Sequence, residues 1–96
     1  MFVVNVRWYT DPETGEPHAL KHGVTEEEIH SAIAGVIEDR QGVDGVRVFV
    51  GKADDGQVLR VVYVPDLEPG SIFVITAYPL GAKALKALRR RMRRMT

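Results

Sequence analysis

The chain contains no cysteine, and it has no acidic residue after Glu68. Without cysteine it can form neither a disulfide nor a thiolate-ligated zinc site, and it has no cysteine nucleophile. No apolar run approaches the roughly 18 residues of a membrane-spanning helix, and the first residues lack the basic lead of a secretory signal. These absences predict a cytoplasmic protein that does not associate with membranes.

Charge is distributed unevenly along a chain whose formal net charge is zero. The residues up to Tyr78 hold six Lys/Arg and all thirteen Asp/Glu, a net charge of −7, whereas the residues from Pro79 onward hold seven Lys/Arg and no acid, a net charge of +7. Five of these arginines fall within LRRRMRRM, residues 88–95. Such a segment favours an acidic or phosphate-bearing partner, and the alternative is that it folds back on the protein's own carboxylates.

Four segments rich in β-branched and aromatic residues predict β-strands. They cover residues 2–9, 46–51, 58–64 and 71–78. The Asp-Gly step in KADDGQ predicts a hairpin between the second and third segments, and the Pro-Gly step in DLEPGS predicts the next turn. Pro79 follows the last segment and is predicted as the first residue of a closing helix, where its missing N–H costs nothing.

The segment GVTEEEIHSAIAGVIEDRQG carries the signal for a first helix. Thr25 is predicted as its N-cap, and Glu28, three residues later, completes a capping box. Four apolar residues recur after the cap at helical spacing: Ile29, Ile33, Val36 and Ile37. They predict one apolar helix face, which must pack on the sheet.

The closing helix is predicted at about residues 80–95, which are nearly all good helix formers. Its apolar stripe consists of Leu85, Leu88 and Met92, and Met95 extends it. The helix would dock through this stripe and present arginines to solvent. The order strand, helix, three antiparallel strands, helix predicts an α+β fold in which an antiparallel sheet packs against helices, as one domain over residues 1–96.

Arg60 is the exception in an apolar strand. It shares a strand face with Val58, Val62 and Val64, and the other face is also apolar. A charged residue in the middle of a strand is rarely buried without a partner. Two interpretations stay open: the arginine pairs with one of the many carboxylates, or it binds a phosphate group bidentately.

Three segments resemble those of a known toxin family. LKHGVTEEEIHSAI (residues 20–33), VFVGKADDGQVLRVVYV (48–64) and FVITAYPLGAKALKALRRRMRR (73–94) are similar to segments of BrnT-type toxins and their uncharacterised-domain relatives in the RelE-like superfamily. The resemblance covers roughly residues 18–94. It implies a RelE-like fold, metal-independent cleavage of RNA without a cofactor, and neutralisation by a cognate antitoxin.

The last strand departs from that pattern at two positions. Phe73 and Tyr78 stand where the family carries arginines, which removes two phosphate contacts. A tyrosine at this strand end also occurs in ribonucleases of the wider superfamily. The two candidate functions are therefore a ribonuclease toxin of a type II toxin–antitoxin system and a non-catalytic binding module of the same fold.

Metal-free RNA cleavage needs a base for the 2′-hydroxyl proton, cations for the phosphorane and an acid for the 5′-oxygen. His22 is the candidate acid or base, because imidazole titrates near neutral pH. Lys21 and Arg60 are candidate phosphate contacts, and Tyr78 is a candidate proton donor or a ring that stacks on a base. The alternatives are an exposed turn histidine, a solvated lysine and a core tyrosine.

The closing helix supplies the predicted nucleic-acid contacts Lys83, Arg89, Arg90 and Arg93. RNA phosphates, the ribosome surface and an acidic antitoxin segment are candidate partners. The alternative is a solvated helix end whose cations suit the helix dipole.

A metal site is not predicted. His18 and His22 have the i, i+4 spacing of two metal ligands, and His30 or Glu26 would be the third. However, two histidines at this spacing without a catalytic glutamate between them are common by chance.

Overall fold

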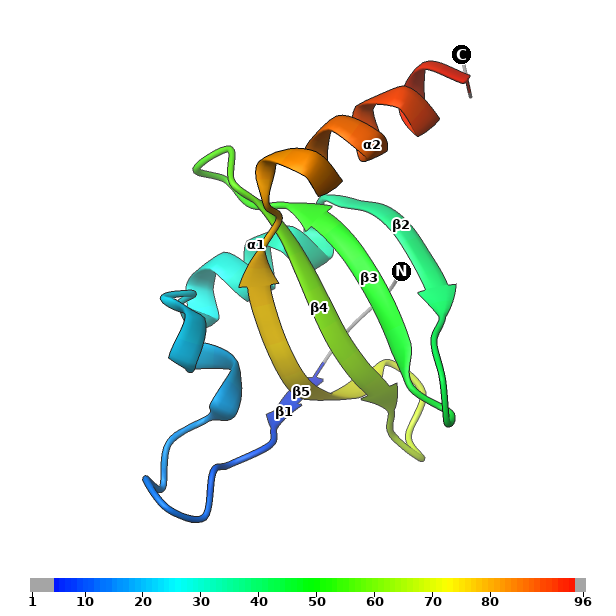
Figure 1. Cartoon of the computed structure of the whole chain (residues 1–96). Coiled ribbons are helices and arrows are strands. Elements are labelled where there is room, and N and C mark those ends of the chain that lie inside the picture. Colours follow the sequence, from blue (N-terminus) through cyan, green and yellow to red (C-terminus); the bar gives the residue numbers. More distant parts are fainter. Residues whose placement is uncertain (1–4, 95–96) are drawn as a thin grey trace.

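The computed structural model describes residues 5–94, which form a five-stranded mixed sheet with two α-helices (Figure 1). The elements are β1 (Asn5–Trp8), the 3₁₀ helix η1 (His18–His22), α1 (Glu26–Ala34), β2 (Val36–Gln41), β3 (Arg47–Lys52), β4 (Val58–Pro65), β5 (Ser71–Pro79) and α2 (Ala82–Arg94). The strands lie in the order β1-β5-β4-β3-β2. This confirms the predicted α+β class and the three antiparallel strands β3, β4 and β5.

The sheet is not purely antiparallel, because β1 pairs with β5 in parallel. A hairpin forces two sequence neighbours to run antiparallel, but β1 joins the sheet beside the last strand of the chain and is free of that constraint. Of the first predicted strand, residues 2–4 lie outside the described residues.

The start of α1 is as predicted. The Thr25 hydroxyl accepts a hydrogen bond from the Glu28 N–H at 3.1 Å, and the Glu28 carboxylate accepts one from the Thr25 N–H at 3.1 Å. This capping box satisfies two backbone donors that the first helical turn cannot satisfy itself.

The predicted apolar helix face is wrong beyond Ile33. The helix ends at Ala34, and Val36 and Ile37 belong to β2, the edge strand that the sequence did not reveal. Gly35 interrupts the helix, and its N–H bonds back to the carbonyls of the last turn. The β-branched residues after it then pair with β3.

The core lies between α1 and one face of the sheet. Figure 1 shows α1 behind the strands and α2 across their upper ends. The helix contributes Ile29, Ala32 and Ile33 to this core, and the strands contribute Phe49, Leu59, Val61, Tyr63, Val74 and Ala77. The opposite face carries Arg60 and has α2 at one end only.

The closing helix begins at Ala82, so the prediction that Pro79 opens it is wrong. Pro79 is the last residue of β5, and the Leu80 N–H donates to the Val58 carbonyl at 3.0 Å, which keeps the chain extended past the proline. The first helical carbonyl belongs to Gly81, which accepts from the Leu85 N–H. Met95 lies outside the described residues. Among residues 5–94, no helix is long and apolar enough to cross a membrane.

Gly51 lies where α1 crosses β3. A side chain there would place its Cβ against the Ala32 carbonyl oxygen, so the helix and the strand would have to separate. Gly51→Ala should therefore lower the free energy of unfolding by about 1–3 kcal/mol, measured by urea denaturation. The control is Gly81→Ala, because an added Cβ there meets nothing within 4 Å and should cost under about 1 kcal/mol. Equal stability of the two variants would contradict the close approach.

Candidate nucleic-acid site

Arg60 and Tyr78 lie side by side on the sheet face opposite α1. They are register partners on β4 and β5, and Val50 on β3 continues the same row. The Arg60 guanidinium carbon lies 6.0 Å from the Tyr78 ring centroid, at the outer limit of a cation–π contact. The Arg60 Nε is buried and has no hydrogen-bond partner within residues 5–94. No salt bridge joins Arg60 to a carboxylate within residues 5–94, although its charge lowers the pKa of Glu38.

His22 approaches Tyr78 from the other side. It is the last residue of η1, which packs along β5, and Gly23 ends the 3₁₀ helix in the left-handed conformation at φ 75°. The His22 and Tyr78 rings meet edge to face, with centroids 5.9 Å apart and planes at 70°. The structure thus brings together three of the four predicted catalytic residues in the order His22, Tyr78, Arg60. We call them the triad.

Lys21 pairs with Asp11 and not with a member of the triad. Its ammonium forms a salt bridge with the Asp11 carboxylate, which also accepts the Glu13 N–H at 2.9 Å. The hydrogen bond from Lys21 lowers the pKa of Asp11. Lys21 therefore has a structural role in fastening the segment before η1 to η1 itself.

The predicted contacts on α2 are all exposed: Lys83, Arg89, Arg90 and Arg93. Within residues 5–94, the side chains of Lys83, Arg89 and Arg90 form no hydrogen bond or salt bridge. These three side chains keep their positive charge available to a partner.

Through Arg91, the basic segment folds back on a carboxylate of the protein itself, that of Glu38. Its Nε and Nη2 donate to the Glu38 carboxylate on β2 at 2.8 and 2.9 Å. The hydrogen bond from Arg91 lowers the pKa of Glu38, and the charges of Arg40 and Arg60 lower it further. This bidentate pair ties α2 to the edge of the sheet.

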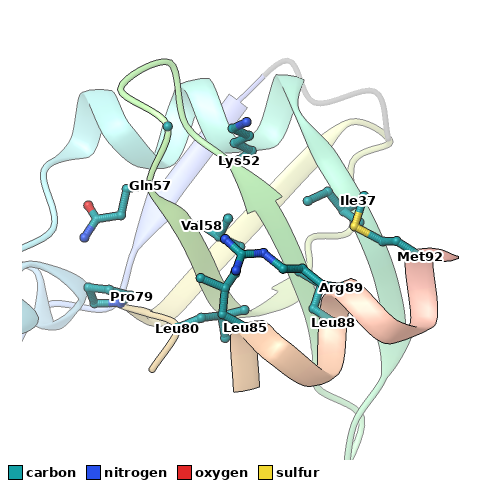
Figure 2. Close-up of a pocket in the computed structure, with 11 residues that line it drawn as sticks. Ile37, Lys52, Gln57, Val58, Pro79, Leu80, Leu85, Leu88, Arg89 and Met92 are labelled. Carbon is teal, nitrogen blue, oxygen red and sulfur yellow. The ribbon is translucent and has the colours of Figure 1, made fainter. Parts of the chain in front are cut away.

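An apolar cleft of about 390 Å³ lies between α2 and the strand ends (Figure 2). Its apolar lining includes Ile37, Val58, Leu80, Leu85, Leu88 and Met92, and Lys52 and Arg89 add two cations. The predicted stripe of α2 therefore faces the sheet, although only Leu88 is buried and Met92 is 42% exposed. No member of the triad lines the cleft, which adjoins the triad through Pro79 and Val58.

Three further rings lie in the same row as the triad and were not predicted as part of the site: Tyr9, His18 and Phe73. Tyr9 lies 6.1 Å from His18 and 6.5 Å from Phe73, and His18 lies 6.2 Å from His22, all between ring centroids. Tyr9 and Phe73 are 64 positions apart and meet because β1 pairs with β5. A parallel pairing of distant strands leaves no local sequence signal, so only the tertiary structure reveals this group.

The histidines do not gather around a metal position. Among residues 5–94, no three His, Asp or Glu side chains are arranged to hold a metal ion. His30 packs against Trp8, with ring centroids 6.1 Å apart, while His18 and His22 lie in the row of rings beside β5.

Comparison of the chain with family models, with curated proteins and with solved structures gave no match. The function must therefore be argued from the residues and their geometry.

Glu38 makes the docking of α2 dependent on pH. Because Arg91 lowers the folded-state pKa of Glu38, the stabilisation is complete above the usual value of 4.5 and is lost as the pH falls through the lowered pKa. Hydrogen-exchange protection of α2 amides should therefore fall at acid pH, relative to β4 amides. Glu38→Gln should lower α2 protection about three- to tenfold at pH 7 and abolish this extra acid sensitivity. Unchanged α2 protection in Glu38→Gln would show that Arg91 does not anchor the helix.

Proposed function

We propose that the protein is a metal-independent endoribonuclease with a RelE-like fold, acting as the toxin component of a type II toxin–antitoxin system. The single observation that carries the activity is the triad: an exposed imidazole, a phenol and a guanidinium in one contiguous row. The toxin assignment is supported by the resemblance of residues 20–33, 48–64 and 73–94 to BrnT-type toxins.

Each triad member fits one task in the cleavage. Arg60 is the phosphate ligand, because its guanidinium lies beside Tyr78 and forms no salt bridge within residues 5–94. His22 is the base that takes the 2′-hydroxyl proton, and Tyr78 is the acid that protonates the departing 5′-oxygen. The 2′-oxygen bonds to phosphorus as the bond from phosphorus to the 5′-oxygen breaks, leaving a 2′,3′-cyclic phosphate and a 5′-hydroxyl.

The exposed cations of α2 would hold the rest of the RNA strand. The helix starts three residues after Pro79, so its first turn lies close in the chain to Tyr78. Lys83, Arg89 and Arg90 are exposed and have no carboxylate partner in residues 5–94. Phosphate contacts of this kind give affinity without sequence preference.

Cleavage of single-stranded RNA by the purified protein, with a chelator present, tests the activity. His22→Gln and Arg60→Gln should each lower the cleavage rate about 100- to 10,000-fold, because each removes a group that acts on the transition state. The product should carry a 2′,3′-cyclic phosphate.

His30→Gln is the matched control, since His30 is an exposed histidine that contacts Trp8 rather than the triad, and it should cleave at the wild-type rate. A wild-type protein that neither cuts RNA nor slows growth on induction would refute the ribonuclease.

The second candidate is a non-catalytic module that binds RNA through α2. It is favoured by one observation: the side chains of Lys83, Arg89 and Arg90 form no salt bridge within residues 5–94. Binding measured against salt concentration tests it: Arg89→Gln and Arg90→Gln should each reduce the slope of log affinity against log salt by about 0.7–1. Arg47→Gln is the control, because Arg47 pairs with Asp39 and lies outside α2. A slope that the α2 variants leave unchanged would exclude this role for the helix.

A further inference from the structure

A continuous row of rings runs along the outer side of β5. At one end the Arg7 guanidinium lies over the Phe73 ring, 5.3 Å from its centroid. Phe73 then meets Tyr9 at 6.5 Å with planes at 87°, and Tyr9 meets His18 at 6.1 Å with planes at 67°. The row is therefore built from three separate parts of the chain.

The row continues without a gap into the triad. The His18 and His22 rings meet at 6.2 Å with planes at 84°, His22 meets Tyr78, and the Arg60 guanidinium carbon lies 6.0 Å from the Tyr78 ring centroid. We call the five rings, Phe73, Tyr9, His18, His22 and Tyr78, the ring strip. An arginine stands at each end of it.

A β-bulge in β5 puts both ends of the strip on one sheet face. Phe73 and Tyr78 are five residues apart, so regular alternation would place them on opposite faces. In the pairing with β4, however, Val62 is opposite Thr76 and the next residue, Tyr63, is opposite Val74, which leaves Ile75 as the extra residue. The two rings therefore share a face, and they lie about 13 Å apart along the sheet, because their partners Val64 and Arg60 are four residues apart on β4.

Backbone hydrogen bonds hold the middle of the strip in place. The Tyr9 N–H donates to the Val74 carbonyl at 2.8 Å, and the His18 N–H donates to the Tyr9 carbonyl at 2.9 Å. The strip is consequently a preformed surface rather than a set of side chains on a loose loop.

The strip is open to solvent, unlike the aromatic pair in the core. Phe49 and Tyr63 are 0% and 3% exposed, whereas Tyr9 is 42% exposed and the His18 side chain is 34% exposed. His22 is exposed, and Phe73 and Tyr78 are half-buried. Rings that pack edge to face also leave ring faces that the neighbouring ring does not cover.

We propose that the ring strip binds an unpaired segment of RNA by stacking its bases on the rings. Single-stranded nucleic acids are held in this way by aromatic side chains and arginine planes, and bases in a duplex are not available for it. The charges favour a polyanion over a proline-rich peptide, because Arg60 forms no salt bridge within residues 5–94 and the cations of α2 follow Tyr78. This inference rests on the proposed function, which identifies RNA as the ligand. It places the unpaired nucleotides on either side of the cleaved bond on the ring strip.

Binding of a fluorescent single-stranded 2′-O-methyl RNA of ten nucleotides tests the strip. This RNA lacks the 2′-hydroxyl nucleophile, so binding is measured without cleavage. Tyr9→Leu and Phe73→Leu should each weaken binding about 5- to 100-fold, whereas Tyr9→Phe should bind as the wild type does. The duplex of the same sequence should bind more weakly than the single strand. Leu67→Ala is the control, because Leu67 is fully exposed and lies outside the strip.

The outcomes separate the strip from the nuclease. If Tyr9→Leu bound the RNA with the wild-type affinity, the proposed strip would be overturned, even if Phe73→Leu did not fold, because Tyr9 is the more exposed residue. The proposal would also be overturned if a proline-rich peptide displaced the fluorescent RNA and unlabelled single-stranded RNA did not. Binding that depends on Tyr9 in a protein that leaves unmodified RNA uncut would support the strip and refute the ribonuclease. Cleavage of unmodified RNA by a protein whose RNA binding does not depend on Tyr9 would support the ribonuclease and refute the strip.

Discussion

The bulge at Ile75 is the feature on which the candidate site depends. The bulge reverses the sheet face to which each side chain in the second half of β5 points. Tyr78 therefore lies on the same face as Phe73, beside Arg60. At the same time Val74 and Ala77 remain on the opposite face, in the core under α1. One extra residue thus lets a single strand contribute one set of side chains to the core and the other set to a continuous candidate binding surface.

The partners of β5 complete that surface. On one side β4 supplies Arg60, and on the other side β1 pairs only with the first half of the strand. The η1 helix packs along the remainder, which brings His22 to Tyr78. Each partner is held by backbone hydrogen bonds or by the buried core, so the side chains of the candidate site lie on rigid elements.

The aromatic rings and most of the positive charges lie on different parts of this protein. The strip consists of rings, and Arg7 at its end forms a bidentate pair with Asp66, whose pKa that arginine lowers. The cations concentrate on α2, where Arg91 pairs with Glu38 and the side chains of Lys83, Arg89 and Arg90 are exposed. A nucleic acid uses both kinds of surface, phosphates on the cations and bases on the rings.

The sequence by itself determined the features that local physics decides: the capping box at Thr25, the β3–β4 hairpin and the apolar stripe of α2. It misled at Val36, because a short apolar run after a glycine fits both a helix of period 3.6 and a strand of period 2. Only the tertiary structure decided the parallel pairing of β1, the bulge at Ile75 and hence the meeting of Tyr9, Phe73 and His22. These depend on contacts between residues far apart in the chain, whose energies no local pattern records.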